Sequence, residues 1–281
     1  MPSFPIIDTH VHFWDGGRVP LSWQAGSAID RPFLPADLFA DAGAVNVEGV
    51  VFVEAAVDEG HHLAEADFVR ALAADEPRIR AIVAHAPMSD PAVGRDLETL
   101  AANPLLRGVR DLIQGRDAGA MCGNAAFRDG LRRLPALGLH FELCILHHQL
   151  GAVLKLVEAL PEVSFVLDHI AKPGIAAGLR DPWWDEIAAL AANENVTCKI
   201  SGVATEADHA SWRDEELLPY VERVVEVFGP QRLLFGSDWP VMRLAISYPR
   251  WVEIVDAAIA PLTEAERRLV YEGNARRVYR L

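Results

Sequence analysis

The chain has 281 residues, of which 51% are hydrophobic and 23% are charged, and its formal net charge is -14 at pH 7. This length suits one α/β barrel, and the hydrophobic fraction is large enough for an extensive core, which excludes a disordered chain. The negative charge argues against a nucleic-acid or anionic-membrane partner, because binding to phosphate groups needs a basic patch.

The cysteines and the start of the chain bear on its location. Cys122, Cys144 and Cys198 lack the C-x-x-C spacing of a zinc knuckle and are an odd number. They are typical of reduced thiols, so we expect a cytoplasmic protein. There is no basic segment followed by an apolar run at the start, and no apolar stretch reaches about 18 residues. We therefore expect neither a signal peptide nor a membrane span.

Apolar runs alternate with helical patterns along the chain. The runs predicted as strands are 6–12, 49–56, 80–86, 105–110, 139–145, 163–169, 196–202 and 232–238. The helical patterns begin at Pro35 and continue over 61–75, the segment up to Asn103, 125–137, the segment up to Leu160, 183–193, 215–228 and the C-terminal region, where Asn274 is placed as a cap. Segment 13–35 is rich in glycine, proline and tryptophan, and its length favours a lid or a binding loop.

This alternation predicts the fold class. Strands that are apolar throughout are buried on both faces, as in an all-parallel sheet. Strands that alternate with helices form right-handed βαβ units. Eight such units in fewer than 300 residues predict an α/β protein with a single (β/α)8 TIM barrel over residues 1–281, without a second domain.

The first predicted strand ends in Ile7-Asp8-Thr9-His10-Val11-His12. Side chains alternate in direction on an extended chain, so His10 and His12 project from the same face. Two imidazoles that converge on one point indicate a metal site or a proton-transfer site. The other interpretation is that the pair is a coincidence and that one histidine lies in a solvated loop.

Polar residues also stand at the ends of the other predicted strands. In a (β/α)8 barrel the carboxyl ends of all strands meet at one face, where catalytic groups lie. The residues at these ends are His10, His12, Glu54, His85, Arg110, Glu142 or His147, His169, Lys199 and Asp238. A single polar residue after a strand usually only begins a loop, and the roles of His85, Glu142, His147 and His148 stay open. The whole set predicts an active site at this face.

Five motifs resemble the amidohydrolase superfamily, amidohydrolase-2 type, over essentially the whole chain. They are Ile7-Asp8-Thr9-His10-Val11-His12, Arg107-Gly108-Val109-Arg110, Val166-Leu167-Asp168-His169-Ile170-Ala171-Lys172-Pro173, Lys199-Ile200-Ser201-Gly202 and Gly236-Ser237-Asp238-Trp239-Pro240. They are most similar to the branch of sugar and dicarboxylate lactonases (L-fuconolactonase, L-rhamnonolactonase and pyrone-dicarboxylate lactonase-like proteins). The segment from Gly273 to Tyr279 is similar to the ending of that branch. The resemblance implies a TIM barrel of the metal-dependent hydrolase type.

The resemblance also implies roles for site residues. It implies that Asp238 activates water, and that His10 and His12 either hold one divalent metal or bind substrate in a metal-free enzyme. We expect zinc with His10, His12 and Asp238 as ligands. Members with two metals carry lysine or glutamate where this chain has Arg110, and a guanidinium only donates, so we expect no binuclear site. The usual histidine of the fifth strand is missing, which leaves the metal-free alternative open.

Hydrolysis of a lactone needs an activated water, a group that polarises the carbonyl and an acid for the leaving alkoxide. We predict that Asp238, held near His169, takes the proton from water. Arg110, His12 or zinc would stabilise the carbonyl oxygen. The catalytic candidates are Asp238, His169 and Arg110, and the substrate-binding candidates are Glu54, Lys172, Lys199, Trp239 and Trp14.

Three of these candidates have a second interpretation. Lys199 could instead form a structural ion pair across the barrel. Trp14, like Trp23, could pin its loop to the barrel rim. Glu54 could add an oxygen ligand to the metal.

The predicted function is a hydrolase that opens a small sugar lactone or a related carboxylated lactone in carbohydrate catabolism. One alternative is a zinc-dependent decarboxylase of the same superfamily, since fold analogy alone does not separate the two. A second alternative is a non-catalytic binding protein on a barrel scaffold. We expect a small-molecule partner and leave a homo-oligomer open.

Overall fold

The computed structural model describes residues 2–281, which form an eight-stranded parallel barrel. The strands pair in the order β1 to β8 and are β1 Ile6–Val11, β2 Val47–Val53, β3 Ile79–His85, β4 Leu106–Arg110, β5 His140–Leu143, β6 Phe165–Leu167, β7 Val196–Ile200 and β8 Leu233–Phe235. A bridge between Val11 and Trp239 returns the end of the last strand to the first. The predicted (β/α)8 barrel is therefore confirmed.

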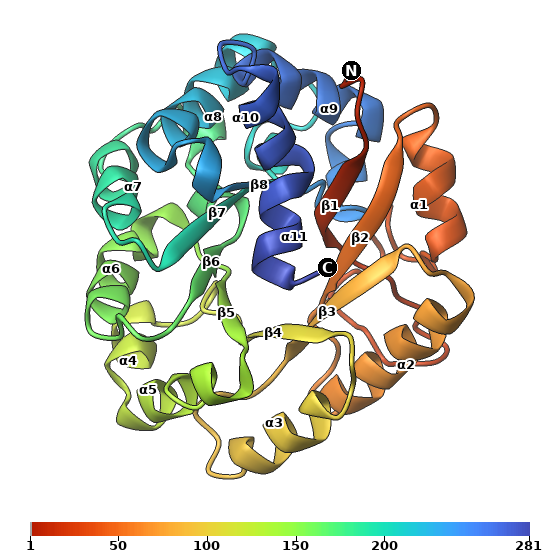
Figure 1. The fold of residues 1–281 in the computed structure, drawn as a ribbon, viewed down its shortest axis with the longest axis vertical. Helices are drawn as coiled ribbons and strands as arrows, with labels where there is room; N and C mark the ends of the chain where they lie inside the picture. Colours follow the sequence, from red (N-terminus) through yellow and green to blue (C-terminus); the bar gives the residue numbers. More distant parts are fainter. Residues whose placement is uncertain (1) are drawn as a thin grey trace.

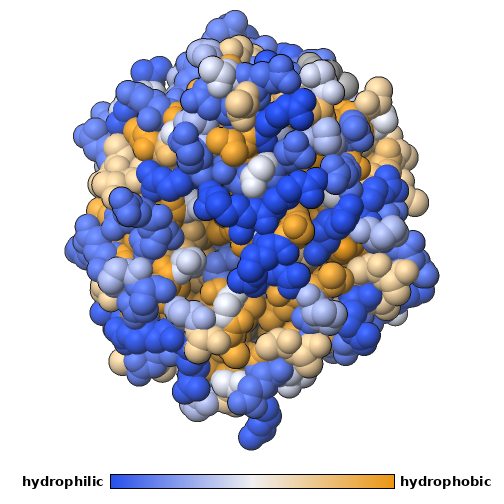
Figure 2. All heavy atoms as spheres, viewed as in Figure 1, coloured by the Kyte–Doolittle hydropathy of each residue, from blue (hydrophilic) through white to orange (hydrophobic). Residues whose placement is uncertain are grey.

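The helices surround the barrel (Figure 1). They are α1 Pro35–Ala42, α2 His62–Asp75, α3 Val93–Ala101, α4 Ala118–Gly123, α5 Ala125–Leu131, α6 Leu150–Glu158, α7 Trp183–Ala191, α8 Asp214–Phe228, α9 Tyr248–Ala258, α10 Glu264–Arg268 and α11 Asn274–Tyr279. Figure 1 also shows that α11 lies across one end of the barrel, near its centre. In the space-filling view of this end, hydrophilic residues predominate over α11 (Figure 2).

Several predicted boundaries differ from the structure. The segment predicted as one helix over 125–137 is α5 followed by a separate short turn at Pro135–Leu137, and α4 precedes it without having been predicted. Asn274 is the first residue of α11 and not a cap. Its side-chain amide donates hydrogen bonds to the carbonyl oxygens of Pro230 and Leu233, at 2.7 and 2.8 Å. These bonds connect α11 to the start of β8.

Side chains along the barrel strands largely alternate between two surroundings, with an irregularity in β1 between Asp8 and Val11. One set of side chains, including Ile7, Val51, Val83, Val166 and Leu234, packs inside the barrel with Tyr279 of α11. The other set packs outwards in the main core. Because side chains have a period of two along a strand, polar residues in phase with the first set also point inwards. This phase places charged side chains inside the barrel.

The loop 13–35 is fixed to the barrel by its aromatic residues. Trp14 and Phe33 exchange two backbone hydrogen bonds, and Trp14 Nε1 donates to the carbonyl oxygen of Arg31 at 2.8 Å. Trp23 Nε1 donates to the carbonyl oxygen of Ala55, just after β2. Trp14 is buried and packs edge-on against Phe33, so it pins the loop to the barrel, and its ring centroid lies 6.5 Å from that of His12.

Two other expectations concern the residues that the structure describes. Within 2–281, no helix is both long and apolar enough to cross a membrane. Cys122, Cys144 and Cys198 are free and buried.

Candidate active site

The first and last strands meet at a cluster of two histidines and an aspartate. His12 Nε2 lies 3.2 Å from Asp238 Oδ1, and His10 Nε2 lies 3.7 Å from the same oxygen. The backbone fixes this geometry, because Asp238 N donates to the carbonyl oxygen of His10 and His12 N donates to that of Trp239. All three side chains are buried.

His169 enters the same cluster through an unusual turn at the end of β6. His169, Ile170, Ala171 and Lys172 all have positive φ angles, between 45° and 63°, although none is glycine. Each such residue costs on the order of 1–2 kcal/mol. The turn is held by hydrogen bonds from Trp183 Nε1 to the carbonyl oxygen of Ile170 and between His169 Nδ1 and Ser201 Oγ, at 2.8 and 2.9 Å. Backbone strain of this kind gathers at functional sites.

The result of this turn is that His169 Nε2 faces Asp238 Oδ1 at 3.9 Å. Gly202, at φ +59°, makes this approach possible because it has no side chain. A Cβ at this position would lie 2.6 Å from His169 Nδ1 and 3.1 Å from Asp238 Oδ2. A larger residue at this position would displace His169 or Asp238.

Arg110 joins the cluster to β2. Its Nε donates to Glu54 Oε1 at 2.6 Å, its Nη2 donates to the Glu54 carbonyl oxygen, and its Nη1 lies 3.0 Å from Asp168 Oδ2. Nη1 is also 3.4 Å from His10 Nε2. Most N–H donors of the guanidinium are thus bonded to protein groups. Arg110 therefore organises the site and has few free donors for a substrate.

Lys199 lies deeper inside the barrel. Its Nζ is 2.5 Å from Glu142 Oε2, 3.2 Å from Asp168 Oδ1 and 3.3 Å from His10 Nδ1, and it is fully buried. The ion pair across the barrel is therefore the interpretation of Lys199 that the structure supports. The burial of Lys199 and its two carboxylate partners leave its ammonium engaged by the protein itself.

The buried charges set the protonation states of the site. Burial lowers the pKa of His169 to about 4, and burial followed by the charge of Lys199 lowers the pKa of His10 well below its usual range. Burial opposes ionisation of Asp238, but the neighbouring His169 and the hydrogen bond with His12 hold its pKa below the ordinary value. Burial likewise opposes ionisation of Asp168, and Lys199 followed by His10 holds its pKa well below the usual range. At pH 7 the site thus combines neutral His10 and His169 with ionised Asp168 and Asp238.

The arrangement of atoms fits a divalent metal. His12 Nδ1 lies 2.8 Å from the carbonyl oxygen of Val53, which only accepts, so Nδ1 carries the proton. Nε2 then faces Asp238 Oδ1 at 3.2 Å, so these two atoms are bridged either by a proton in a hydrogen bond or by a metal ion.

The balance of charges in the buried cluster around Arg110 and Lys199 also favours a divalent metal. Four carboxylates face two cations in it: Glu54, Glu142, Asp168 and Asp238 against Arg110 and Lys199. Buried charge has to be compensated, and a divalent cation supplies the missing two charges. The ligand atoms of His10, His12 and Asp238 lie within 4.8 Å of one another, as do those of His10, Asp168 and His169. The first group fits a metal better, because Asp168 is already paired with Arg110 and Lys199.

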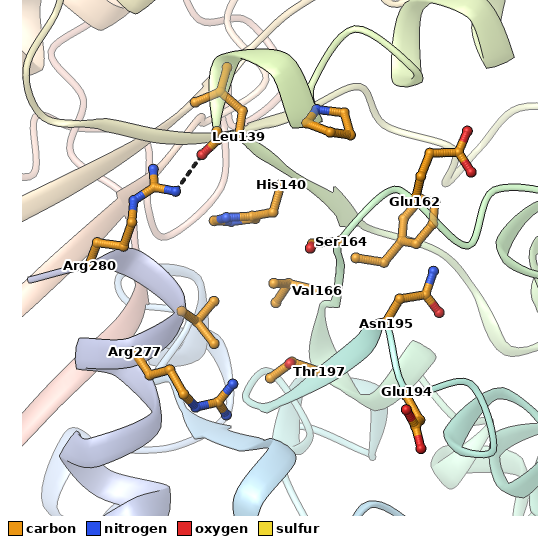
Figure 3. Close-up of a pocket in the computed structure, with 14 residues that line it drawn as sticks. Leu139, His140, Glu162, Ser164, Val166, Glu194, Asn195, Thr197, Arg277 and Arg280 are labelled. Atoms are coloured by element: carbon orange, nitrogen blue, oxygen red, sulfur yellow. Dashed lines mark hydrogen bonds between the residues drawn. The ribbon is translucent and has the colours of Figure 1, made fainter.

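Two cavities lie at opposite ends of the barrel. One, here called the mouth cavity, has a volume of about 380 Å³ and lies where β2, β3 and β4 end. It reaches the cluster through Glu54, which pairs with Arg110, and its polar lining is Glu54, Glu59, His85, Ser89, Asp90, Asp111 and Arg116. The other, of about 410 Å³, lies where β5, β6 and β7 begin, and Figure 3 shows His140, Val166, Arg277 and Arg280 around it. The larger cavity is thus far from the cluster, and the first one is the candidate substrate cavity.

Other predicted residues lie around this centre in different ways. Lys172 is partly exposed, with Nζ 3.8 Å from Glu206 Oε1. His85 lines the mouth cavity, and its Nδ1 faces the Arg110 carbonyl oxygen at 3.1 Å. His147 and His148 begin the short helix His147–Gln149. Trp239 is a correction, because it is fully buried and donates from Nε1 to Asp41 Oδ2 at 2.8 Å, away from the predicted substrate site.

Two buried polar residues of the centre, Asp168 and Ser201, were not predicted as site residues, and the role of a third, Glu142, had stayed open. Asp168 contacts Arg110 and Lys199, and its Oδ1 lies 3.3 Å from His10 Nδ1. The signal that could have found Asp168 is a carboxylate within an apolar strand, which is almost never buried without a partner.

Comparisons with known proteins agree with this geometry. The amidohydrolase family matches residues 7–281. The L-fucono-1,5-lactonase of Burkholderia ambifaria is 31% identical to this chain, and the alignment covers 98% of this chain and 95% of the relative. The L-fucono-1,5-lactonase of Burkholderia multivorans is 33% identical, with 98% of this chain and 96% of the relative aligned. A crystal structure of an amidohydrolase from Burkholderia multivorans with bound zinc is 32% identical, covers 99% of this chain and 100% of its own, and superposes with a TM-score of 0.88. The resemblance in the motifs is confirmed, and the chain belongs to the amidohydrolase family of enzymes.

Proposed function

We propose that this enzyme hydrolyses the ring ester of a small sugar-acid lactone. The observation that carries the proposal is the convergence of His10, His12 and His169 on Asp238. The mouth cavity reaches this cluster through Glu54 and its partner Arg110. The similarity to L-fucono-1,5-lactonases over nearly the full length of both chains supports the reaction class. A role in carbohydrate catabolism follows from this substrate class.

The buried residues divide the chemistry among them. Asp238 takes a proton from water as the water oxygen bonds to the lactone carbonyl carbon, and it returns this proton to the ring oxygen when the carbon–oxygen bond breaks. His169 is oriented by Ser201 and faces Asp238 Oδ1 at 3.9 Å, close enough to act on its charge. Arg110 keeps Glu54 and Asp168 in position, which is a different role from polarising the carbonyl directly.

His10, His12 and Asp238 would hold one zinc ion, which matches the three protein ligands and one open position of a catalytic zinc site. When bound there, zinc would supply Lewis-acid polarisation of the ester carbonyl and would ease the deprotonation of water.

The mouth cavity favours a neutral substrate that carries hydroxyl groups. Its polar lining has the carboxylates Glu54, Glu59, Asp90 and Asp111 against the single guanidinium of Arg116. Arg116 is already paired with Asp111 at 2.8 Å. Sugar hydroxyls donate hydrogen bonds to carboxylates, whereas a dicarboxylate would be repelled. We therefore favour an aldonolactone over a dicarboxylate lactone.

The test is a panel of five- and six-carbon aldonolactones together with 2-pyrone-4,6-dicarboxylate, followed by acid release and carbon dioxide release. We expect acid release from at least one aldonolactone with kcat/KM of roughly 10⁴ M⁻¹s⁻¹ or more. The dicarboxylate as best substrate would contradict the substrate class. Carbon dioxide release without lactone hydrolysis would instead indicate the decarboxylase.

A further inference from the structure

The cavity at the far end of the barrel has no part in the chemistry proposed above. This bottom cavity has a volume of about 410 Å³ and lies where β5, β6 and β7 begin. Small-molecule sites have volumes of about 300–1,000 Å³. His140 and Thr197 of the barrel line it together with Arg277 of α11. It is thus large enough for a complete small molecule.

The charged side chains of the bottom cavity are separated by sign. Figure 3 shows Arg277 and Arg280 on one side of the cavity and Glu162 and Glu194 on the other. A ligand with a negative group at one end and hydrogen-bond donors at the other matches this division.

The two arginines keep donors for a ligand. Within residues 2–281, neither forms an ion pair with a carboxylate. Arg277 bonds only through Nη2, which donates to the carbonyl oxygen of Gln231 at 2.6 Å and to Asn274 Oδ1 at 3.2 Å. Arg280 bonds only through Nη1, which donates to the carbonyl oxygen of Gly138 at 2.5 Å. Nε and one Nη of each guanidinium are therefore left, and guanidinium groups bind carboxylates with paired donors.

A third arginine shows that positive charge at this end is not fully compensated. Burial, followed by the charge of Arg280, lowers the pKa of Arg107, so the two guanidinium groups repel each other. A bound carboxylate would relieve this repulsion.

His140 supplies a buried polar atom without a protein partner. Its side chain lines the bottom cavity, although the residue is only 5% exposed. Its Nε2 lies 3.3 Å from Glu142 Oε1, a carboxylate oxygen that accepts the hydrogen bond. Nδ1 is then an acceptor, and no donor of the described chain reaches it. A hydroxyl group of a ligand would provide that donor.

The side opposite the arginines offers further groups for hydroxyls. In the part of the chain that the structure describes, Glu194 has no cationic partner, and the hydroxyls of Ser164 and Thr197 make no hydrogen bond. Glu162 has only a distant partner, at 3.6 Å from Arg132 Nε. Serine and threonine hydroxyls both donate and accept, as sugar hydroxyls do, whereas an ammonium group only donates. This side therefore favours hydroxyl groups over an amine.

We propose that the bottom cavity is a second ligand site, which binds a small polyhydroxy carboxylate. Its carboxylate would lie on Arg277 and Arg280, and its hydroxyls would face Glu194, Ser164 and His140. An aldonate, the kind of product that opening an aldonolactone releases, has this chemistry. That source of the ligand rests on the proposed function, whereas binding at this site does not.

The test is a titration of the purified protein with gluconate, followed by the NMR signals of the histidine rings. His140 lines the bottom cavity, whereas His10, His12 and His85 lie at the other end of the barrel, so the signals show which end is occupied. We expect gluconate to move the His140 signals with a Kd of roughly 1 mM or less, the range in which enzymes meet their substrates. His140 signals that stay in place, or that move only with a weaker Kd, would overturn the inference.

Variants show whether the arginines hold the ligand. Arg277→Gln and Arg280→Gln should each weaken gluconate binding at His140 roughly tenfold or more, because a hydrogen bond to a charged group is lost. Arg133→Gln is the control, since Arg133 is exposed and does not line the cavity. Unchanged binding in both cavity variants, or an equal loss in Arg133→Gln, would overturn the proposal.

Related probes test the chemical class. Sorbitol lacks the carboxylate, hexanoate lacks the hydroxyls, serine adds an ammonium group and inorganic phosphate is an anion only. Each should bind at His140 at least roughly tenfold more weakly than gluconate. Equal binding of any one of them would contradict a polyhydroxy carboxylate site. If no lactone is hydrolysed, the proposed function fails while the gluconate titration still decides this inference.

Discussion

His12 and Asp238 lie 3.2 Å apart although 226 residues separate them in the chain. The contact crosses the seam at which β8 returns to β1, and two backbone hydrogen bonds at the same seam hold it. Asp8 strengthens the seam, because its carboxylate accepts from the backbone N–H of Ser237 and from the hydroxyl of Tyr248, both at 2.9 Å. The contacts that close the barrel between β8 and β1 therefore also bring His12 and Asp238 together.

We expect purified protein to bind one zinc ion per chain at this seam. His12→Asn should lose the ion, because the amide is a weaker ligand and cannot reproduce the imidazole nitrogen that faces Asp238. His85→Asn is the matched control, since His85 lies at the mouth but outside both groups of candidate ligands. Metal content and lactone turnover are measured after chelation and after zinc is restored.

In that experiment, chelated protein should lose its turnover and regain it with zinc. Full activity in verified metal-free protein would contradict the metal site and would make His10 and His12 substrate-binding residues.

Arg110→Lys should be damaging although the charge is kept. One ammonium cannot replace the separate contacts of Nε with Glu54 and of Nη1 with Asp168. An acceptor left unsatisfied in the interior costs about 1–3 kcal/mol, so the free energy of unfolding should fall by this amount. Turnover should fall at least roughly tenfold, as expected when a residue that orients the site is altered.

Arg70→Lys is the comparison for Arg110→Lys. Arg70 also pairs with an aspartate, Asp67, but the two side chains are 55% and 73% exposed, and exposed pairs contribute about 0–1 kcal/mol. Denaturant unfolding and steady-state kinetics measure both variants. Equal behaviour of the two would show that the buried contacts of Arg110 are unimportant.

The sequence predicted the parts of this enzyme that depend on local pattern. Apolar runs and their polar ends located the strands and the mouth, because strand ends meet at one face of a barrel. Partners inside the barrel could not be predicted, since Asp168 meets Arg110 from 58 residues away and Glu142 meets Lys199 from 57. These pairings depend on the stagger of the strands, which no local pattern encodes.

The turn after β6 could also not be predicted from the sequence. Four successive residues from His169 to Lys172 adopt left-handed backbone angles without glycine or asparagine, so no residue type signals the turn. It is stabilised by Trp183 and Ser201, which come from later elements. The sequence placed His169 at the end of a strand and missed how it is aimed.

Glu65 should make stability depend on pH. Burial, followed by the charge of Glu54, raises the pKa of Glu65 to about 8, and its Oε1 accepts from Ala55 N at 2.7 Å. The folded protein then binds this proton more tightly than the unfolded chain does. Its contribution to stability is complete below pH 4.5 and is lost as the pH rises through 8.

Glu65→Gln keeps the acceptor and removes the titration. We expect the stability of Glu65→Gln relative to the unaltered protein to rise by on the order of a few kcal/mol between pH 5 and pH 8. Urea unfolding across this range measures the difference, with exposed Glu98→Gln as the control. A difference that stays constant with pH would show that Glu65 does not carry the proton in the folded state.

The central claim is that Asp238 transfers the proton when the lactone opens, and Asp238→Asn tests it most directly. The amide keeps the shape of the side chain but cannot accept the proton from water, so kcat on the best aldonolactone should fall by roughly 10²–10⁴. Circular dichroism and unfolding must show a folded variant, and zinc content must be measured alongside, because Asp238 is also a candidate ligand. Asp117→Asn, which alters an exposed helix cap, should keep full turnover. A folded Asp238→Asn with near-normal turnover would contradict the account.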